Sequence, residues 1–119
     1  MKYQTLPLIL TQDDCQIEGA ITATTGEVDG IGTSNKWYCS DYVNVRKYKR
    51  ADIIPRLTGI TVGIALYDKN YDYVWGFAYS NIKEVGNLIE FPQNVSYYYI
   101  RITASKKQPD FLTTVTLTR

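Results

Sequence analysis

The sequence of 119 residues contains no histidine and only two cysteines. Without histidine, neither a Ser-His-Asp triad nor a Cys-His pair can form, so the common nucleophile systems are excluded. Zinc sites built on histidine are excluded as well, and two thiols cannot complete a site of four thiolates. We therefore expect no catalytic residue, no metal site and no cofactor in this protein.

Long apolar runs and nucleotide-binding loops are also missing. The sequence has no run of about 18 apolar residues, which a membrane-spanning helix would need. The phosphate-binding patterns GxxxxGK and GxGxxG do not occur. Residues 1–5 lack the apolar stretch and the small-residue cleavage site of a signal peptide. These absences predict no membrane partner, and a chain that stays where it is made or leaves within an assembly or by lysis.

An excess of charge of one sign is absent too. The chain has 13 basic and 12 acidic residues and a net charge of +1, so it produces no long-range field that attracts nucleic acid. The basic run 46–50 encloses Tyr48 and is compatible with a phosphate contact. So short a run in a near-neutral chain favours a solvated loop or a subunit contact. We expect no nucleic-acid partner.

The two cysteines, Cys15 and Cys39, leave two alternatives open. They are too few for the framework of a disulfide-rich secreted domain, but they are enough for one disulfide bond. The other alternative is that they are two small, half-buried thiols.

The residues that are present indicate one soluble, folded domain over 1–119. Hydrophobic residues make up 45% of the chain, and this length fits a single core. The chain contains 11 tyrosines. Tyrosine favours both strands and surfaces that are half dry and half wet, so its abundance predicts β structure, recognition surfaces or both.

The hydrophobic pattern has a period of two throughout, interrupted by Gly, Asn, Asp and Pro, which is typical of strands. The expected strands are 16–24, 37–45, 53–54, 60–66, 71–78, 88–91, 96–104 and 111–119. About eight strands, each with one apolar side, predict an all-β, antiparallel two-sheet β-sandwich.

Several strands carry more specific predictions. Both sides of 60–66 are apolar or small, which predicts a central, buried strand. Pro55 cannot donate to a ladder, so 53–54 is predicted to lie at a sheet edge. In 37–45, alternation places Tyr38 and Tyr42 on one side. In the last strand, Val115 and Leu117 are predicted to face the core.

The segment 68–72 resembles the beginning of a calcium loop, with oxygen ligands at alternate positions. A complete EF-hand loop would need glycine and glutamate where the sequence has Tyr73 and Tyr79. We interpret the segment as a hairpin turn, because Asp and Asn side chains bond to their own backbone in such turns.

Aromatic residues beside polar groups are the candidates for ligand binding, since sugars stack on rings and bond to planar polar groups. Tyr71, Tyr73 and Trp75 are spaced to form a stripe on one strand face, which would otherwise belong to the core. Tyr98 has tyrosine on both sides, and neighbouring rings in a strand cannot all point inward. The candidate ligand-binding residues are Trp37, Tyr38, Asp72, Tyr73, Trp75 and Tyr98.

The order of motifs resembles a known family. The motifs are Glu18-Gly19-Ala20-Ile21, Cys39 to Val45, Ile64 to Asn70 and Tyr98-Tyr99-Ile100-Arg101-Ile102. They are similar to those of the jelly-roll, galactose-binding-like modules found in phage tail and other virion proteins and as carbohydrate-binding modules. The resemblance implies a jelly-roll-like β-sandwich that binds glycans or decorates a larger particle.

The leading functional hypothesis is a non-catalytic virion surface protein that decorates a capsid or tail or recognises host surface glycans. We expect other virion proteins or surface glycans as partners, and a homo-oligomer or an array on the particle. The alternative is an extracellular or cell-surface carbohydrate-binding module of a bacterial glycan-degrading system. A third hypothesis is a small glycosidase or lyase, which would need two of the carboxylates to face each other across a cleft.

Overall fold

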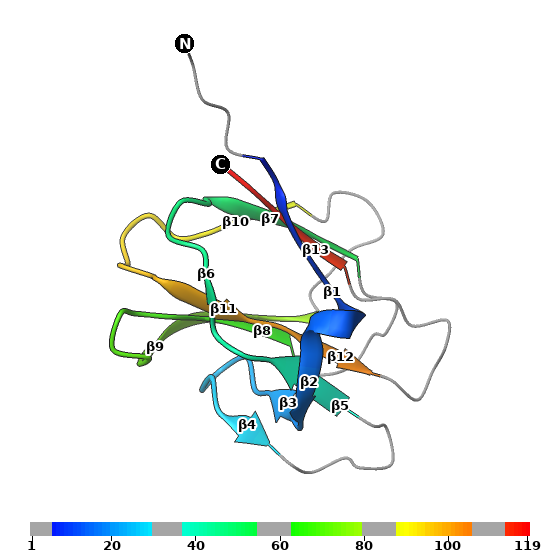
Figure 1. Cartoon of the computed structure of the whole chain (residues 1–119). Coiled ribbons are helices and arrows are strands. Elements are labelled where there is room, and N and C mark those ends of the chain that lie inside the picture. The colour runs from blue at the N-terminus through cyan, green and yellow to red at the C-terminus, as the bar shows by residue number, and fades with distance from the viewer. Residues whose placement is uncertain (1–5, 30–36, 55–62, 80–87, 106–113) are drawn as a thin grey trace.

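The computed structural model describes residues 6–29, 37–54, 63–79, 88–105 and 114–119 (Figure 1). Its strands are β1 (Leu8–Thr11), β2 (Cys15–Glu18), β3 (Ala20–Ile21), β4 (Val28–Asp29), β5 (Trp37–Ser40), β6 (Val43–Asn44), β7 (Arg50–Ile54), β8 (Gly63–Tyr67), β9 (Tyr73–Ala78), β10 (Leu88–Glu90), β11 (Tyr99–Arg101), β12 (Thr103–Ser105) and β13 (Thr114–Thr118). A single 3-10 turn, η1 (Gln12–Asp14), connects β1 to β2. The expected starts of the strands at 60–66 and 111–119 lie outside the described residues.

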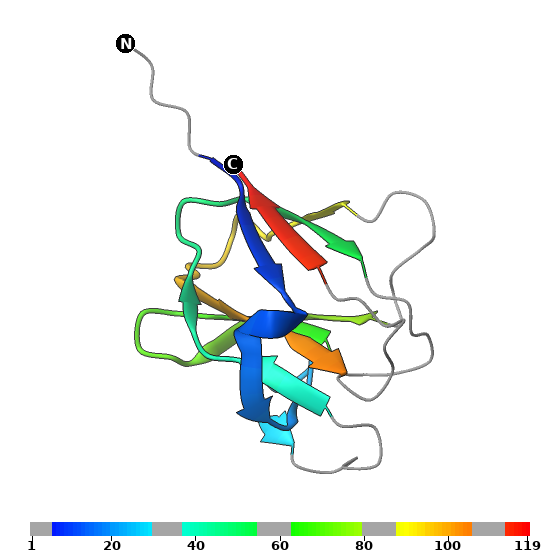
Figure 2. The same cartoon turned by 45° about the vertical axis from the view of Figure 1, so that its right-hand side comes forward.

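The strands form several antiparallel sheets, which confirms the all-β prediction. One sheet has the order β1-β13-β7-β10 and another the order β6-β11-β8-β9. A three-stranded sheet, β12-β5-β2, and the β3-β4 pair complete the described part. Figures 1 and 2 show the β1-β13-β7-β10 sheet as one layer with the β8, β9 and β11 strands below it.

The β5–β6 and β11–β12 segments pair with each other along their length. Thr103 lies opposite Cys39, and Ile100 lies opposite Val43. The first segment therefore needs one residue more than the second to cover the same distance, which defines a β-bulge between Ser40 and Val43. The bulge shifts the alternation: Tyr38 packs against the main core, whereas Tyr42 packs on the other side of the layer. The prediction that Tyr38 and Tyr42 lie on one side of the strand is therefore wrong.

The main core lies between the two layers. Ile53 of β7 and Leu117 of β13 form one cluster with Ile64 and Leu66 of β8 and with Ile100 of β11, all fully buried. Each such side chain contributes about 1.5–3 kcal/mol of transfer free energy. In β13 the alternation of buried and half-buried residues confirms the prediction for Val115 and Leu117.

β8 is the central strand that the sequence predicts. It lies between β11 and β9, and all five of its residues are buried. Alternate residues enter two clusters: Ile64 and Leu66 face the main core, whereas Ala65 and Tyr67 join Ile21 and Cys39 on the opposite side. β8 is thus covered on both faces, which explains its continuous apolar sequence.

Two strand predictions need correction. β7 is longer than the predicted short strand, and its Arg50–Asp52 part lies between β13 and β10. Ile53 and Ile54 themselves pair only with β13 among the described residues, so their predicted edge position is not contradicted. The expected strand 16–24 is interrupted at Gly19, whose φ of 123° is open to glycine but strained for other residues. β3 then turns away to pair with β4.

The buried hydroxyl of Tyr79 is fully paired, whereas Arg50 Nε is buried without a hydrogen-bond partner among the described residues. Tyr79 is fully buried, and its hydroxyl donates to the Thr103 carbonyl at 2.6 Å while accepting from the Thr103 amide at 3.1 Å. Cys15 and Cys39 are both buried and are not joined in a disulfide bond, so the structure has the two-thiol alternative.

We expect Tyr79→Phe to lower the free energy of unfolding by about 1–3 kcal/mol, because it leaves the buried Thr103 amide and carbonyl without their partner. Urea unfolding followed by fluorescence measures the change. Tyr48→Phe is the control, since it removes an exposed hydroxyl bond to the Leu6 carbonyl. Equal losses in the two variants would contradict the role of burial.

Burial raises the pKa of Tyr67 and of Tyr79 well above the ordinary value of about 10. Above about pH 10 the unfolded chain releases protons that the folded chain retains, so stability is complete below that pH and falls as the pH rises. The expected slope is up to about 1.4 kcal/mol per pH unit for each of the two. Unfolding measured between about pH 8 and 11 tests this; a constant free energy across that window would refute it.

Candidate functional site

A cavity of about 610 Å³ lies on the face of β8 that is turned away from the main core. We call it the tyrosine pocket; it is lined by Thr25, Gly26, Glu27, Val28, Tyr42, Tyr67, Tyr71, Asp72, Tyr73 and Arg101. Its volume is within the range of small-molecule sites, and it combines aromatic walls with a few polar groups. No other described cavity brings so many rings together with charged groups of both signs.

Two of the tyrosines hold the β3–β4 turn against the sheet. The Tyr67 hydroxyl donates to the Gly26 carbonyl, and the Tyr73 hydroxyl donates to the Ala23 carbonyl at 2.7 Å. Gly76 permits the same contact, because a Cβ atom there would lie 1.8 Å from the Ala23 oxygen. These bonds fix one wall of the tyrosine pocket to its floor.

Tyr42 and Tyr71 present their rings at the pocket. Tyr71 is 52% exposed, stacks on Tyr99 with ring centroids 4.8 Å apart, and meets Tyr42 edge-on at 4.7 Å. Tyr42 reaches this position because the bulge before β6 turns it away from the main core. Tyr71 has a φ of 67°, a left-handed conformation that is uncommon outside Gly, Asn and Asp.

Arg101 is the cation of the tyrosine pocket. It extends from β11 and is only 7% exposed. Its Nε donates to the Ser40 carbonyl at 2.8 Å, and its Nη2 contacts the Cys39 sulfur at 3.5 Å. Its Cζ lies 4.7 Å from the centroid of the Tyr42 ring, within the range of a cation–π contact.

Three tyrosines and one cysteine of this region have a raised pKa. Burial raises the pKa of Tyr67 and of Tyr73. A hydrogen bond with Tyr71 raises the pKa of Tyr99. Burial also raises the pKa of the Cys39 thiol, although Arg101 opposes this effect. These four groups are therefore uncharged at neutral pH.

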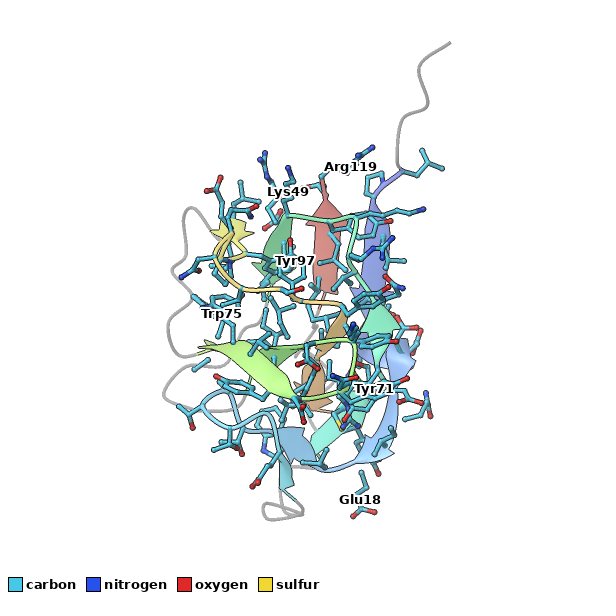
Figure 3. All side chains as sticks on the ribbon, turned by 90° about the vertical axis from the view of Figure 1, so that its left-hand side faces the viewer. Glu18, Lys49, Tyr71, Trp75, Tyr97 and Arg119 are labelled. Atoms are coloured by element: carbon cyan, nitrogen blue, oxygen red, sulfur yellow. The ribbon has the colours of Figure 1, made fainter. Side chains whose placement is uncertain are left out.

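Of the six residues that the sequence singles out, two line the tyrosine pocket: Asp72 and Tyr73. Trp75 does not join them, because β9 also contains a bulge. Leu66 pairs with Trp75 but Tyr67 pairs with Tyr73, so Val74 is the extra residue. Trp75 therefore packs on the main core beside Phe91, with ring centroids 6.2 Å apart, and the predicted three-ring stripe is wrong. Figure 3 shows Tyr71 and Trp75 well apart.

The other three predicted residues lie elsewhere. Trp37 is buried at 6% exposure, and Tyr38 packs against the main core. Tyr98 lines a separate cavity of about 460 Å³ beside the 68–70 turn, and its hydroxyl accepts a hydrogen bond from Arg46 at 2.8 Å. The structure thus divides the candidates among the core and two different surfaces.

The sequence reasoning missed Tyr42, Tyr67, Glu27 and Arg101. One signal was available: Arg101 stands between Ile100 and Ile102 in a strand that is otherwise apolar and aromatic. A charged residue in such a strand needs a special environment, which indicates a candidate site residue.

The 68–72 segment forms a hairpin turn, as predicted. The Asp68 carboxylate accepts hydrogen bonds from the backbone amides of Asn70 and Asp72, at 2.8 and 3.1 Å. Its oxygen is thereby directed toward its own backbone. Among the residues that the structure describes, no three His, Cys, Asp or Glu side chains gather where they could hold a metal ion.

A scan against protein-family models and searches of curated proteins and of solved structures find no match to this chain. In the described ranges, no helix has the length and apolar character that crossing a membrane requires. The tyrosine pocket is therefore interpreted from its own geometry.

We expect Trp75→Ala to lower the free energy of unfolding by about 1–3 kcal/mol, because it removes a half-buried ring that packs against the main core beside Phe91. Thermal or urea unfolding measures the loss. The affinity of the folded protein for any ligand of the tyrosine pocket should be unchanged, since Trp75 does not line that pocket. A stable variant with lost binding would show that Trp75 contacts the ligand.

Proposed function

We propose that this protein is a non-catalytic virion surface protein that recognises host surface glycans through the tyrosine pocket. The observation that carries the glycan part is the grouping of Tyr42 and Tyr71 with Asp72, Glu27 and Arg101 around one cavity. Pyranose rings have apolar C–H faces that stack on aromatic rings, and hydroxyl edges that bond to carboxylates and guanidinium groups. Both kinds of surface meet in this pocket.

We also propose the jelly-roll form of the β-sandwich. If β5–β6 and β11–β12 each count as one strand, and β2 and the β3-β4 pair are additions, eight strands remain. In chain order, the first pairs with the last, the second with the seventh, the third with the sixth and the fourth with the fifth. A long hairpin rolled into two layers has this pairing, and jelly-roll domains occur in viral capsids and lectins.

The resemblance of the sequence motifs to virion modules supports placing the protein on a virus particle. A single open pocket binds weakly, so repeated copies on a particle, or a homo-oligomer, would supply avidity. Decoration of a capsid or tail without glycan binding is the alternative role on the particle. The exposed apolar residues of the β1-β13-β7-β10 sheet are Ile9, Ile54 and Leu88. Thr116 and Asp52 lie between Ile9 and Leu88 across the sheet, and Thr114 lies opposite Ile54, so polar residues interrupt the surface that such a role would use.

Two other functions make different use of the same pocket. A carbohydrate-binding module would bind the glycan without being part of a virus particle. It would serve a bacterial glycan-degrading enzyme system. A glycosidase or lyase would need two carboxylates across the bound sugar, and Glu27 and Asp72 both line the cavity. Incubation of bound oligosaccharide with the protein, followed by analysis for shortened products, separates this alternative: product formation would reject the non-catalytic proposal.

We expect Tyr71→Asn to weaken glycan binding about tenfold or more, because it removes an exposed ring from the tyrosine pocket. Asparagine tolerates the left-handed backbone at this position, so the change adds little strain. Binding is measured by calorimetry with the oligosaccharides selected from a glycan array. Tyr98→Ala, which alters the separate cavity beside the 68–70 turn, is the control.

The two variants give distinguishable results. Loss in Tyr71→Asn with retention in Tyr98→Ala supports the tyrosine pocket, and the reverse would move the site to the Tyr98 cavity. Unaltered binding in both would reject the proposed site. Attachment to assembled particles, with no binding to any glycan of the array, would make the protein a structural decoration.

A further inference from the structure

Arg101 is a buried cation that forms no ion pair with a described residue. Its contacts there are the Ser40 carbonyl, the Cys39 sulfur and the Tyr42 ring, none of which is a carboxylate. The carboxylates of Glu27 and Asp72 line the same cavity. Burying a charge is costly unless an opposite charge and hydrogen bonds compensate. Arg101 is more than nine-tenths buried and still lines the tyrosine pocket, so an anion in the pocket could compensate it.

The guanidinium retains donors for such an anion. An arginine has five N–H donors in a fixed planar arrangement. Nε and one Nη2 donor are directed at Ser40 and Cys39, and the Tyr42 ring lies over the group. The Nη1 donors and the second Nη2 donor have no partner among the described residues. That free edge has the geometry that binds a planar carboxylate through two parallel hydrogen bonds.

We propose that the tyrosine pocket binds a sugar that carries a carboxylate, such as a uronic or sialic acid, with the carboxylate on the free edge of Arg101. This inference rests on the proposed function. The sugar ring would lie against Tyr42 or Tyr71, and Asp72 and Glu27 would accept hydrogen bonds from its hydroxyls.

The other charged groups of the pocket limit the charge of the ligand. Glu27 and Asp72 line the same cavity as Arg101, so the three groups together carry a net negative charge. They would repel a polyanion such as a heavily sulfated glycan or a nucleic acid. One carboxylate bound directly to Arg101 is compatible with this distribution.

The test compares oligosaccharides that differ only in charge. Tetragalacturonate is compared with its methyl ester, and sialyllactose with the methyl ester of its sialic acid, on an array that also holds neutral and sulfated glycans. We expect at least one acidic member to bind at least tenfold more tightly than its uncharged partner, since a charge-assisted hydrogen bond is lost in the latter. Equal binding within both pairs would overturn the inference and leave glycan recognition standing.

Two further outcomes count against the inference. Preferred binding of sulfated glycans would show that the pocket does not select a carboxylate but accepts anionic groups in general. Absence of binding to every glycan would reject the proposed function together with the inference.

Asp72→Asn tests the charge balance without altering Arg101, whose own replacement would remove the bond to Ser40. The variant weakens an acceptor for the hydroxyls of acidic and neutral sugars alike, but it also removes one negative charge from the rim. The ratio of acidic-sugar affinity to neutral-sugar affinity should therefore rise about 3- to 10-fold. Asp52→Asn, on the exposed face of β7, is the matched control with the same change of charge, and its ratio should stay constant. An unchanged or lower ratio in Asp72→Asn would contradict an anionic ligand.

Discussion

Burial of β8 on both faces is the constraint on which the rest of the structure depends. One face, through Ile64 and Leu66, joins the core shared with β7 and β13. The other face, through Ala65 and Tyr67, must be covered by other segments, because no complete sheet packs against it in the described part. The β3–β4 turn supplies this cover through the bonds of Tyr67 and Tyr73 to its backbone. The tyrosine pocket lies where that cover is incomplete.

Alternation along single strands was enough to predict much of the fold. The buried strand around Ile64, the hairpin that follows it and the inward residues of β13 all come from period-two patterns and from the turn chemistry of Asp68. The errors occur where one residue is added to a strand. The bulges at Val74 and before Val43 reverse the side on which neighbouring rings lie, and nothing in the local sequence marks them, since bulges depend on the register of the partner strand.

The site was less predictable than the fold because it is assembled from distant segments. Tyr42, Tyr67, Tyr73 and Arg101 come from four strands or their ends and meet only through cross-strand pairing. Asp72 and Tyr73 were found because both follow a turn that the sequence does mark. Trp37 and Trp75 were candidates because aromatic residues beside polar groups can stack on sugars, yet large rings also stabilise the folded state when they are buried. Trp37 is buried, and Trp75 packs against the main core.

The bulges that the sequence did not reveal also determine which side chains meet in the tyrosine pocket. A regular strand would have left Tyr42 on the core side with Tyr38, and Arg101 would then lack the ring that lies over its guanidinium. With Tyr42 turned outward, the guanidinium is shielded from water by an uncharged aromatic face and held by Ser40. Low local dielectric strengthens its attraction for an anion at the remaining edge. Tyr67 and Tyr73 remain uncharged, so in the proposed complex the charge of the ligand would be sensed mainly at Arg101 and at the carboxylates of Glu27 and Asp72.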